Sequence, residues 1–331
     1  MGTSPTVTVC IPTYNRSGLL RSSLQSVLWQ SLRDVEVIVS DNASTDDTEE
    51  VVRSLGDPRV VYDRNPVNIG LFGNMSRCLR LGTGRYRVVL PDDDLMLPGN
   101  LERKVAFLER HPEAAMVHSG FRLLDLEGNP AGPIMNWSRL TEDTVEPGMS
   151  FVRRSIALGG LVCVSSVMLR SEHVADERFD ADDGPYADMA LWLRVATRGG
   201  IGFIPDPLSG LRVHSGSASS GFQTVRVRRG QPKLTSCHAD ALRQAHGRFV
   251  ARADLDPVTR NQLAEALSQA DRRLRLSIMV NSHVPPVALR AAKRAAGWRP
   301  GARLHTLISL EGAYTPPPLG PSSDQSREEV R

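Results

Sequence analysis

The N-terminal third of the chain alternates short apolar segments with stretches of helical periodicity, and this alternation constrains the fold more than any other feature. Apolar or β-branched runs, interrupted only by Glu36 and Arg87, occupy residues 7–11, 35–39, 60–62 and 86–91. Between them, apolar side chains recur at helical spacing over residues 19–28, 45–55 and 71–81. Strands that are apolar throughout are buried on both faces, and strands joined by helices run parallel. The sequence therefore predicts an α/β fold with a mixed or parallel, Rossmann-like sheet flanked by helices.

Polar clusters directly follow three of these predicted strands. They are Pro12-Thr13-Tyr14-Asn15-Arg16 after the first strand, Asp41-Asn42 after the second, and Asp92-Asp93-Asp94 after the fourth. In open sheets of this kind, ligands bind at the carboxyl ends of the strands. We therefore expect these clusters to lie together in one site.

The three consecutive aspartates are the clearest indication of chemistry. Carboxylates this close repel one another unless a cation neutralises them, and Mg²⁺ and Mn²⁺ prefer oxygen ligands. Aspartate is also common in turns and at helix N-termini, so a solvated acidic turn accounts for the same residues. The sequence has no Cys and His spacing typical of a zinc site.

The second half of the chain is less regular. We expect helices at 99–110, 149–158 and 186–197, strands at 115–124, 162–169, 201–207 and 211–214, and a loop through residue 137. Further helical patterns at 232–253, 257–279 and 286–296 follow a change to Arg, Ala, Gln and Leu. The predicted organisation is an α/β domain over 1–223, a helical C-terminal subdomain over 224–314 and a disordered, proline-rich and charged tail over 315–331.

Composition and charge place the chain among ordinary globular proteins. With 23% charged residues and a net charge of +3, nothing indicates a nucleic-acid partner. The cysteines Cys10, Cys78, Cys163 and Cys237 are scattered, which favours a reducing compartment. No apolar run reaches the roughly 18 residues of a spanning helix, and no signal-peptide pattern opens the chain. We expect a cytoplasmic protein that is neither exported nor membrane-spanning.

Two arginine clusters leave peripheral membrane contact open. They comprise Arg226, Arg228 and Arg229, and then Arg272, Arg273 and Arg275. Such clusters suit the anionic inner face of a membrane, but solvated helix faces carry the same charges. The oligomeric state is not determined by the sequence.

Several blocks together resemble one family, the family 2 glycosyltransferases. The blocks are Val9-Cys10-Ile11-Pro12-Thr13-Tyr14-Asn15-Arg16, Val37-Ile38-Val39-Ser40-Asp41-Asn42-Ala43-Ser44-Thr45-Asp46, Asn68-x-Gly70-x-x-x-Asn74, Leu90-Pro91-Asp92-Asp93-Asp94, Leu191-Trp192-Leu193-Arg194 and His214. Their order and spacing match the family over roughly residues 5 to 220, a combination that is highly specific. The resemblance implies a GT-A fold, a nucleotide-sugar donor, a divalent cation (Mn²⁺ or Mg²⁺) and inversion at the anomeric carbon.

The resemblance also implies a substrate class and a role for the cation. By family habit, UDP or dTDP sugars are expected over GDP sugars. The acceptor would be a hydroxyl or amine of a growing polysaccharide, a lipid-linked sugar or a small natural product. Independently of the family, a diphosphate leaving group gains negative charge as the glycosidic bond breaks, and a metal held by carboxylates stabilises that charge.

Site residues follow from the matching positions. The donor would be bound by Pro12, Thr13, Tyr14, Asn15, Arg16, Asp41, Asn42, Asn68, Asn74, Asp92 and Asp93. For the metal we favour an Asp-x-Asp pair of Asp92 and Asp94 together with His214. Most relatives begin their acidic box one position earlier, where this chain has Pro91, so the aspartate that contacts the metal is left open.

An inverting displacement needs a base that removes the proton of the acceptor hydroxyl. Asp188 is the candidate, because it precedes Leu191-Trp192-Leu193-Arg194 in the register of the family's Glu-Asp pair. The Glu of that pair is Ala187 here. Asp182 and Asp183 on the preceding loop are alternatives, and a structural interpretation makes Asp188 a polar residue at a helix start.

Three other functions are alternatives to the transferase. A sugar nucleotidyltransferase normally has a glycine-rich basic loop after its first strand, whereas residues 12–16 contain no glycine. A phosphotransferase with an aspartyl nucleophile needs Asp-x-Asp after that strand, which here ends in Pro-Thr-Tyr-Asn. A non-catalytic sugar-nucleotide-binding module would keep the acidic cluster and tolerate loss of Asp188.

Overall fold

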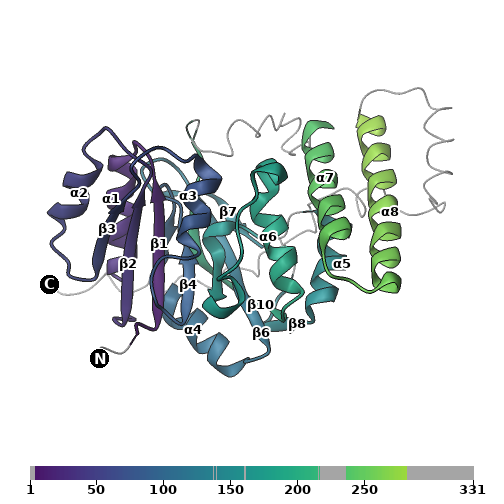
Figure 1. Cartoon of the computed structure of the whole chain (residues 1–331), viewed down its shortest axis with the longest axis horizontal. Coiled ribbons are helices and arrows are strands. Elements are labelled where there is room, and N and C mark those ends of the chain that lie inside the picture. Colours follow the sequence, from purple (N-terminus) through teal and green to yellow (C-terminus); the bar gives the residue numbers. More distant parts are fainter. Residues whose placement is uncertain are drawn as a thin grey trace, which may run out of the picture.

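The structure, a computed structural model, describes residues 4–136, 138, 140–159, 162–214, 216 and 236–281 (Figure 1). The helix expected at 286–296 and the tail expected at 315–331 lie outside this range, as do Arg226, Arg228 and Arg229.

The N-terminal half forms the predicted parallel sheet. In chain order its elements are β1 (Val7–Thr13), α1 (Ser17–Leu28), β2 (Val35–Asp41), α2 (Thr48–Ser54), β3 (Val60–Arg64), α3 (Leu71–Cys78) and β4 (Tyr86–Val89). The four strands pair in parallel in the order β3-β2-β1-β4, and β1 and β4 are buried along their whole length. The register places Thr13 opposite Asp41, so the polar clusters after β1 and β2 meet at one edge.

The second half extends this sheet with strands of both directions. Its elements are β5 (Leu95–Met96), α4 (Asn100–Arg110), β6 (Ala114–Leu124), β7 (Pro130–Met135), β8 (Thr144–Glu146), α5 (Gly148–Leu158), β9 (Val167–Arg170), α6 (Ala187–Ala196) and β10 (Gly200–Arg212). The order continues from β4 as β9-β6-β10-β5, with β9 antiparallel to both neighbours and β10 parallel to β6. The predicted mixed α/β sheet flanked by helices is confirmed.

Three segments differ from the sequence prediction for local reasons. The strand expected over 162–169 is reduced to β9, because residues 164–166 form a 3₁₀ turn in which the Ser166 hydroxyl donates to the Cys163 carbonyl at 2.6 Å. The two strands expected at 201–207 and 211–214 are one strand, β10, whose register shifts around Pro207, a residue without an N–H. The loop expected before residue 137 contains β7, which pairs with β6 as a hairpin.

Two helices, α7 (Ser236–Arg252) and α8 (Pro257–Asn281), follow the α/β part and pack beside α5 and α6 (Figure 1). Phe249 and Val250 of α7 and Leu263 of α8 are buried in the same apolar core as Leu191 and Trp192 of α6. The described part of these helices is therefore joined to the α/β part through a continuous core. Within the residues that the structure describes, no helix is both long and apolar enough to span a membrane.

Candidate functional site

The carboxyl ends of β1 and β4 bring the first polar cluster against the aspartates. The Thr13 hydroxyl donates to Asp92 Oδ2 at 2.7 Å. One guanidinium nitrogen, Arg16 Nη1, lies 3.2 Å from Asp92 Oδ1 and 3.0 Å from Asp93 Oδ2. The side chains predicted to share a site from their positions after β1 and β4 are thus in direct contact.

His214, two residues beyond the end of β10, reaches the same cluster. Its Nε2 atom lies 3.2 Å from Asp93 Oδ2. The imidazole therefore contacts Asp93, and the predicted metal ligands Asp92, Asp94 and His214 stay a prediction.

The carboxylate of Asp94 has different hydrogen-bond partners from those of Asp92 and Asp93. It is 1% exposed; its Oδ1 accepts from the main-chain N–H of Arg212 at 2.9 Å, and its Oδ2 accepts from the hydroxyl of Ser165. Arg212 also donates through Nη1 to the Asp93 carbonyl at 3.1 Å. Asp94 thereby joins the acidic segment to β10 and to the turn before β9.

Burial and mutual repulsion destabilise the ionised form of this cluster. Burial, and then the charge of Asp93, raise the pKa of Asp92 to about 6 despite the attraction of Arg16. The same two causes raise the pKa of Asp94. A bound cation would therefore favour the ionised form of these carboxyls.

The donor set fits a divalent cation that completes its coordination with a ligand. Among the described residues, no three His, Cys, Asp or Glu side chains are grouped as a ready-made metal site. Asp93 and His214 nevertheless place a carboxylate oxygen and an imidazole nitrogen side by side. Mg²⁺ is typically held by one or two carboxylates with substrate phosphates and water, so two protein ligands at this sheet edge fit that pattern.

The second polar cluster begins with Asp41, the last residue of β2. It is fully buried, and its carboxylate accepts from the Ser44 N–H at 3.0 Å and from the Tyr62 hydroxyl at 2.5 Å. Arg64 Nε lies 3.5 Å from Asp41 Oδ2, the oxygen that accepts from the Tyr62 hydroxyl. Sequence reasoning missed Tyr62 and Arg64. The available signal was their position on β3, whose register sets Arg64 opposite Asp41.

Three of the four asparagines predicted to bind the donor, Asn42, Asn68 and Asn74, form hydrogen bonds with one another or with nearby groups of the protein. Asn42 Nδ2 donates to Asn68 Oδ1 at 2.8 Å, and Asn42 Oδ1 accepts from the Ile69 N–H at 2.9 Å. Asn74 is 2% exposed, accepts from the Ser40 hydroxyl and donates to the Ser40 carbonyl, both at 2.8 Å. These contacts bind the loop after β3 to the end of β2, and the donor-binding roles of the three residues stay predictions.

The loop after β1 is held against the loop after β2. Asn15 has a left-handed backbone (φ 52°), and its side-chain oxygen accepts from the Thr45 N–H at 2.8 Å. Asparagine tolerates this conformation better than most residues. Pro12 is buried in the ladder opposite Ser40, whereas Tyr14 is 44% exposed beside the site. An exposed ring at this edge is available to a ligand.

Asp188 lies in the first turn of α6 and is partly exposed. It accepts from the Met189 N–H at 2.7 Å, and in the part of the chain that the structure describes no cation is paired with it. Burial raises its pKa to about 6. Burial raises the pKa of the nearby Cys163 thiol to about 12, with smaller contributions from the charges of Asp94 and Asp188.

Comparison with known proteins identifies the family. The sequence profile of glycosyl transferase family 2 matches residues 8–154. The "Putative glycosyltransferase EpsE" of Bacillus subtilis (strain 168) is 30% identical over 209 residues, which cover 61% of this chain and 71% of that protein. The chain belongs to glycosyltransferase family 2. The predicted resemblance is therefore confirmed, and with it the transferase class.

Solved structures support the GT-A fold of this glycosyltransferase. Residues 1–349 of S. aureus TarS in complex with UDP-GlcNAc superpose with a TM-score of 0.63 at 16% identity, covering 88% of this chain and 80% of that one. The mannosyltransferase PcManGT of Pyrobaculum calidifontis, in complex with GDP-Man and Mn²⁺, has a TM-score of 0.52 at 18% identity, with coverages of 89% and 80%. At these identities the likeness concerns the fold alone.

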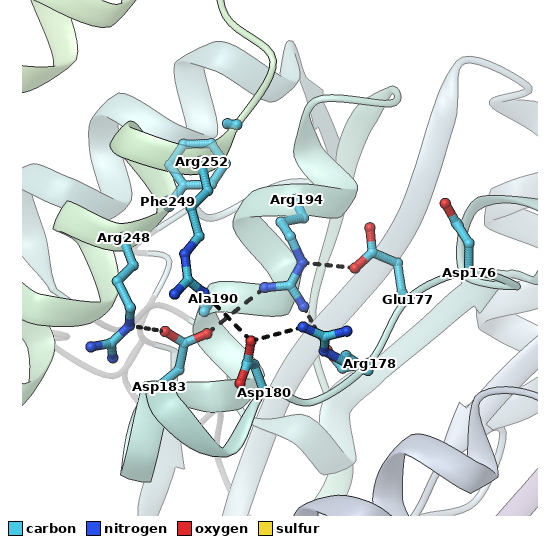
Figure 2. Close-up of a pocket in the computed structure, with 11 residues that line it drawn as sticks. Asp176, Glu177, Arg178, Asp180, Asp183, Ala190, Arg194, Arg248, Phe249 and Arg252 are labelled. Carbon is cyan, nitrogen blue, oxygen red and sulfur yellow. Dashed lines mark hydrogen bonds and ion pairs between the residues drawn. The ribbon is translucent and has the colours of Figure 1, made fainter.

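The alternative bases, Asp182 and Asp183, belong to a cluster of ion pairs beside α7. We call it the arginine pocket; it measures about 250 Å³ and is lined by Asp176, Glu177, Arg178, Asp180, Asp183, Ala190, Arg194, Arg248, Phe249, Arg252 and Ala253. Figure 2 shows the Asp183 carboxylate between two guanidinium groups, with Arg248 Nε at 2.6 Å and Arg194 Nη1 at 3.9 Å. Asp183 is thus engaged in an ion-pair network with two guanidinium groups.

Arg248→Gln is expected to lower the free energy of unfolding by about 2 kcal/mol, because it leaves the buried Asp183 carboxylate without its nearest cation. Urea unfolding followed by circular dichroism measures this. Arg252→Gln is the matched control one turn along α7: its side chain is 61% exposed and its ion pairs are 3.6 and 4.0 Å long. A loss of about 0.5 kcal/mol or less is expected there. Equal losses in the two variants would contradict the role given to Arg248.

Proposed function

We propose that this protein is an inverting, metal-dependent glycosyltransferase that moves a sugar from a nucleoside diphosphate to an acceptor hydroxyl or amine. The observation that carries the proposal is the meeting of Asp92, Asp93, Arg16 and His214 at the sheet edge where family 2 enzymes bind their donor. Asp188, whose pKa is raised to about 6 by burial, suits proton transfer near neutral pH and is the proposed base.

In the proposed reaction, the ionised Asp188 carboxylate accepts the proton of the acceptor hydroxyl. The acceptor oxygen forms a bond to the anomeric carbon as the bond from that carbon to the diphosphate oxygen breaks. The diphosphate leaves with the bonding electron pair, and the sugar is inverted. A divalent cation held by Asp93 and His214 would supply charge stabilisation for the departing diphosphate. Arg16 can add hydrogen bonds to the same phosphates, because a guanidinium matches phosphate geometry.

The donor is proposed to carry uracil or thymine. Asp41, with Tyr62 and Arg64 around its carboxylate, lies at the carboxyl end of β2 where the family acid reads the nucleoside. The complex of TarS with UDP-GlcNAc supports a UDP sugar on the same fold. PcManGT, in complex with GDP-Man, keeps GDP sugars as the alternative to test.

The acceptor class remains a polysaccharide, a glycolipid or a natural product. We infer that residues 125–149 and the helices after residue 224 select it, because they depart from the regular core and would border the open face of the site. A cytoplasmic enzyme, in peripheral contact with the inner face of a membrane where its acceptor is lipid-linked, is part of the same proposal.

A non-catalytic sugar-nucleotide-binding module is the second candidate. The observation that favours it is Ala187, which stands where relatives carry the Glu of their Glu-Asp pair. Such a module would bind the donor at the same edge but would not need Asp188. The Asp188 variant described in the Discussion separates the two functions.

Calorimetric titration with UDP, dTDP and GDP, each with Mn²⁺ and with EDTA, tests the proposed function. Metal-dependent binding of UDP or dTDP is expected, because diphosphate oxygens complete the coordination that Asp93 and His214 begin. Binding of GDP alone would overturn the donor assignment. If none of the three nucleotides binds, the proposed nucleotide site is wrong. The three aspartates would then be interpreted as a solvated acidic turn.

A further inference from the structure

Arg16 is the cation in closest contact with the acidic cluster among the described residues. Its Nη1 atom contacts both Asp92 Oδ1 and Asp93 Oδ2, and its Nη2 atom donates to the main-chain carbonyl of Gly216. The side chain is 29% exposed, so the guanidinium can turn toward solvent or toward a ligand. A single residue of the β1–α1 loop therefore links the acidic cluster to the chain just beyond His214.

The oxygen that Arg16 contacts is also the oxygen that faces His214. Asp93 Oδ2 lies 3.0 Å from Arg16 Nη1 and 3.2 Å from His214 Nε2. A cation bound between Asp93 and His214 needs lone pairs on these two atoms, and a second positive charge 3.0 Å away from the shared oxygen would repel it. Arg16 and a divalent cation therefore compete for Asp93.

The phosphates of a donor resolve this competition. A nucleoside diphosphate brings oxygens that bind a guanidinium in two-point geometry, so Arg16 has an alternative anionic partner only when the nucleotide is bound. Without the nucleotide, the Arg16 guanidinium would lose its charge-assisted hydrogen bonds to Asp92 and Asp93 and would gain no other anionic partner in exchange.

Building on the proposed function, we propose that Arg16 exchanges partners during donor loading: it neutralises Asp92 and Asp93 before the cation binds, and it transfers to the diphosphate when metal and nucleotide bind together. Arg16 is then a positioning residue that disfavours binding of the metal alone and favours binding of the metal with its nucleotide. The transfer also breaks the contact of Arg16 with the Gly216 carbonyl.

Titration of Mn²⁺ by calorimetry, without nucleotide and then with saturating UDP, tests the exchange on the full chain. Arg16→Gln is expected to bind Mn²⁺ alone about tenfold more tightly than wild type, which corresponds to about 1.4 kcal/mol. With UDP the order is expected to reverse, with about tenfold weaker binding in the variant. Misfolding cannot imitate a gain in affinity, so the opposite signs are informative.

Two variants control for charge. Arg64→Gln removes the same charge at the same sheet edge but contacts Asp41, so its affinity for Mn²⁺ alone should equal that of wild type. Arg16→Lys keeps the positive charge but lacks the planar guanidinium. Its affinity for Mn²⁺ should lie between those of wild type and Arg16→Gln.

Each alternative result has a distinct meaning. Unchanged or weaker binding of Mn²⁺ alone by Arg16→Gln, with normal Mn²⁺ and UDP binding by wild type, would overturn the exchange and leave the proposed function standing. An equal gain in affinity for Mn²⁺ alone in Arg64→Gln would mean that the loss of any positive charge at this edge has the same effect. That result would also overturn the exchange. Failure of both wild type and Arg16→Gln to bind Mn²⁺ with UDP would overturn the metal site itself.

Discussion

Replacing Asp188 by Asn is expected to lower kcat about a thousandfold while nucleotide binding is unchanged. The amide keeps the size of the carboxylate and its position in the first turn of α6, but it cannot accept the proton of the acceptor. Steady-state kinetics with the donor identified by calorimetry, together with a nucleotide titration of the same variant, measure both quantities.

The pH profile gives this prediction a second readout. Only ionised Asp188 acts as a base, and its pKa is raised to about 6. The value of kcat/KM for wild type should therefore increase about tenfold per pH unit below pH 6 and level off above it. The Asn variant should lack this limb of the profile.

Loss of folding is not expected to explain the result. Because burial raises the pKa of Asp188, the charged form costs stability in the folded protein above pH 6, and the neutral amide removes that cost. Thermal unfolding at pH 7 should show the variant to be at least as stable as wild type. Activity within tenfold of wild type would exclude Asp188 as the base, and Asp182 would be the next residue to test.

Replacing Asp93 by Asn is expected to abolish metal-dependent nucleotide binding and to lower kcat by about a thousandfold. Asp93 is the carboxylate that faces both His214 and Arg16, at 3.2 and 3.0 Å. The neutral amide is a poor ligand for a hard cation. Calorimetry with UDP in the presence of Mn²⁺ and of EDTA checks the binding, and kinetics check kcat.

Asp94→Asn is the matched control, since it makes the same chemical change at the adjacent residue. The two oxygens of Asp94 accept hydrogen bonds from the Arg212 N–H and the Ser165 hydroxyl, and the ion pairs of Arg16 and His214 with this segment go to Asp92 and Asp93. Asp94→Asn is therefore expected to keep metal-dependent binding of UDP, whereas Asp93→Asn loses it. A stable Asp94→Asn protein that no longer binds Mn²⁺ with UDP would return the metal to the Asp92 and Asp94 pair.

Local sequence determined most helices and strands of this protein and the strand ends that carry the polar clusters. The strands β1, β2 and β4 are recognisable because each is a largely apolar run, buried along nearly all of its length. The strand β3, at the edge of the sheet, is only partly buried. The polar clusters that follow β1, β2 and β4 could be assigned to one site, because parallel strands end at the same sheet edge. The loops after residue 124 were harder to predict, since side-chain hydrogen bonds such as that of Ser166 replaced the expected strand by a turn.

The tertiary structure alone decided which side chains touch. His214 and Asp93 are 121 residues apart in the chain, and Arg16 and Asp93 are 77 apart. Their contacts depend on the order β1-β4-β9-β6-β10, which periodicity within any one segment does not specify. The contact of Tyr62 with Asp41 follows from strand register, and that of Arg248 with Asp183 from the packing of α7 against the segment before α6. Local patterns record whether a residue is buried, whereas pairing across the sheet is set by the packing of the whole chain.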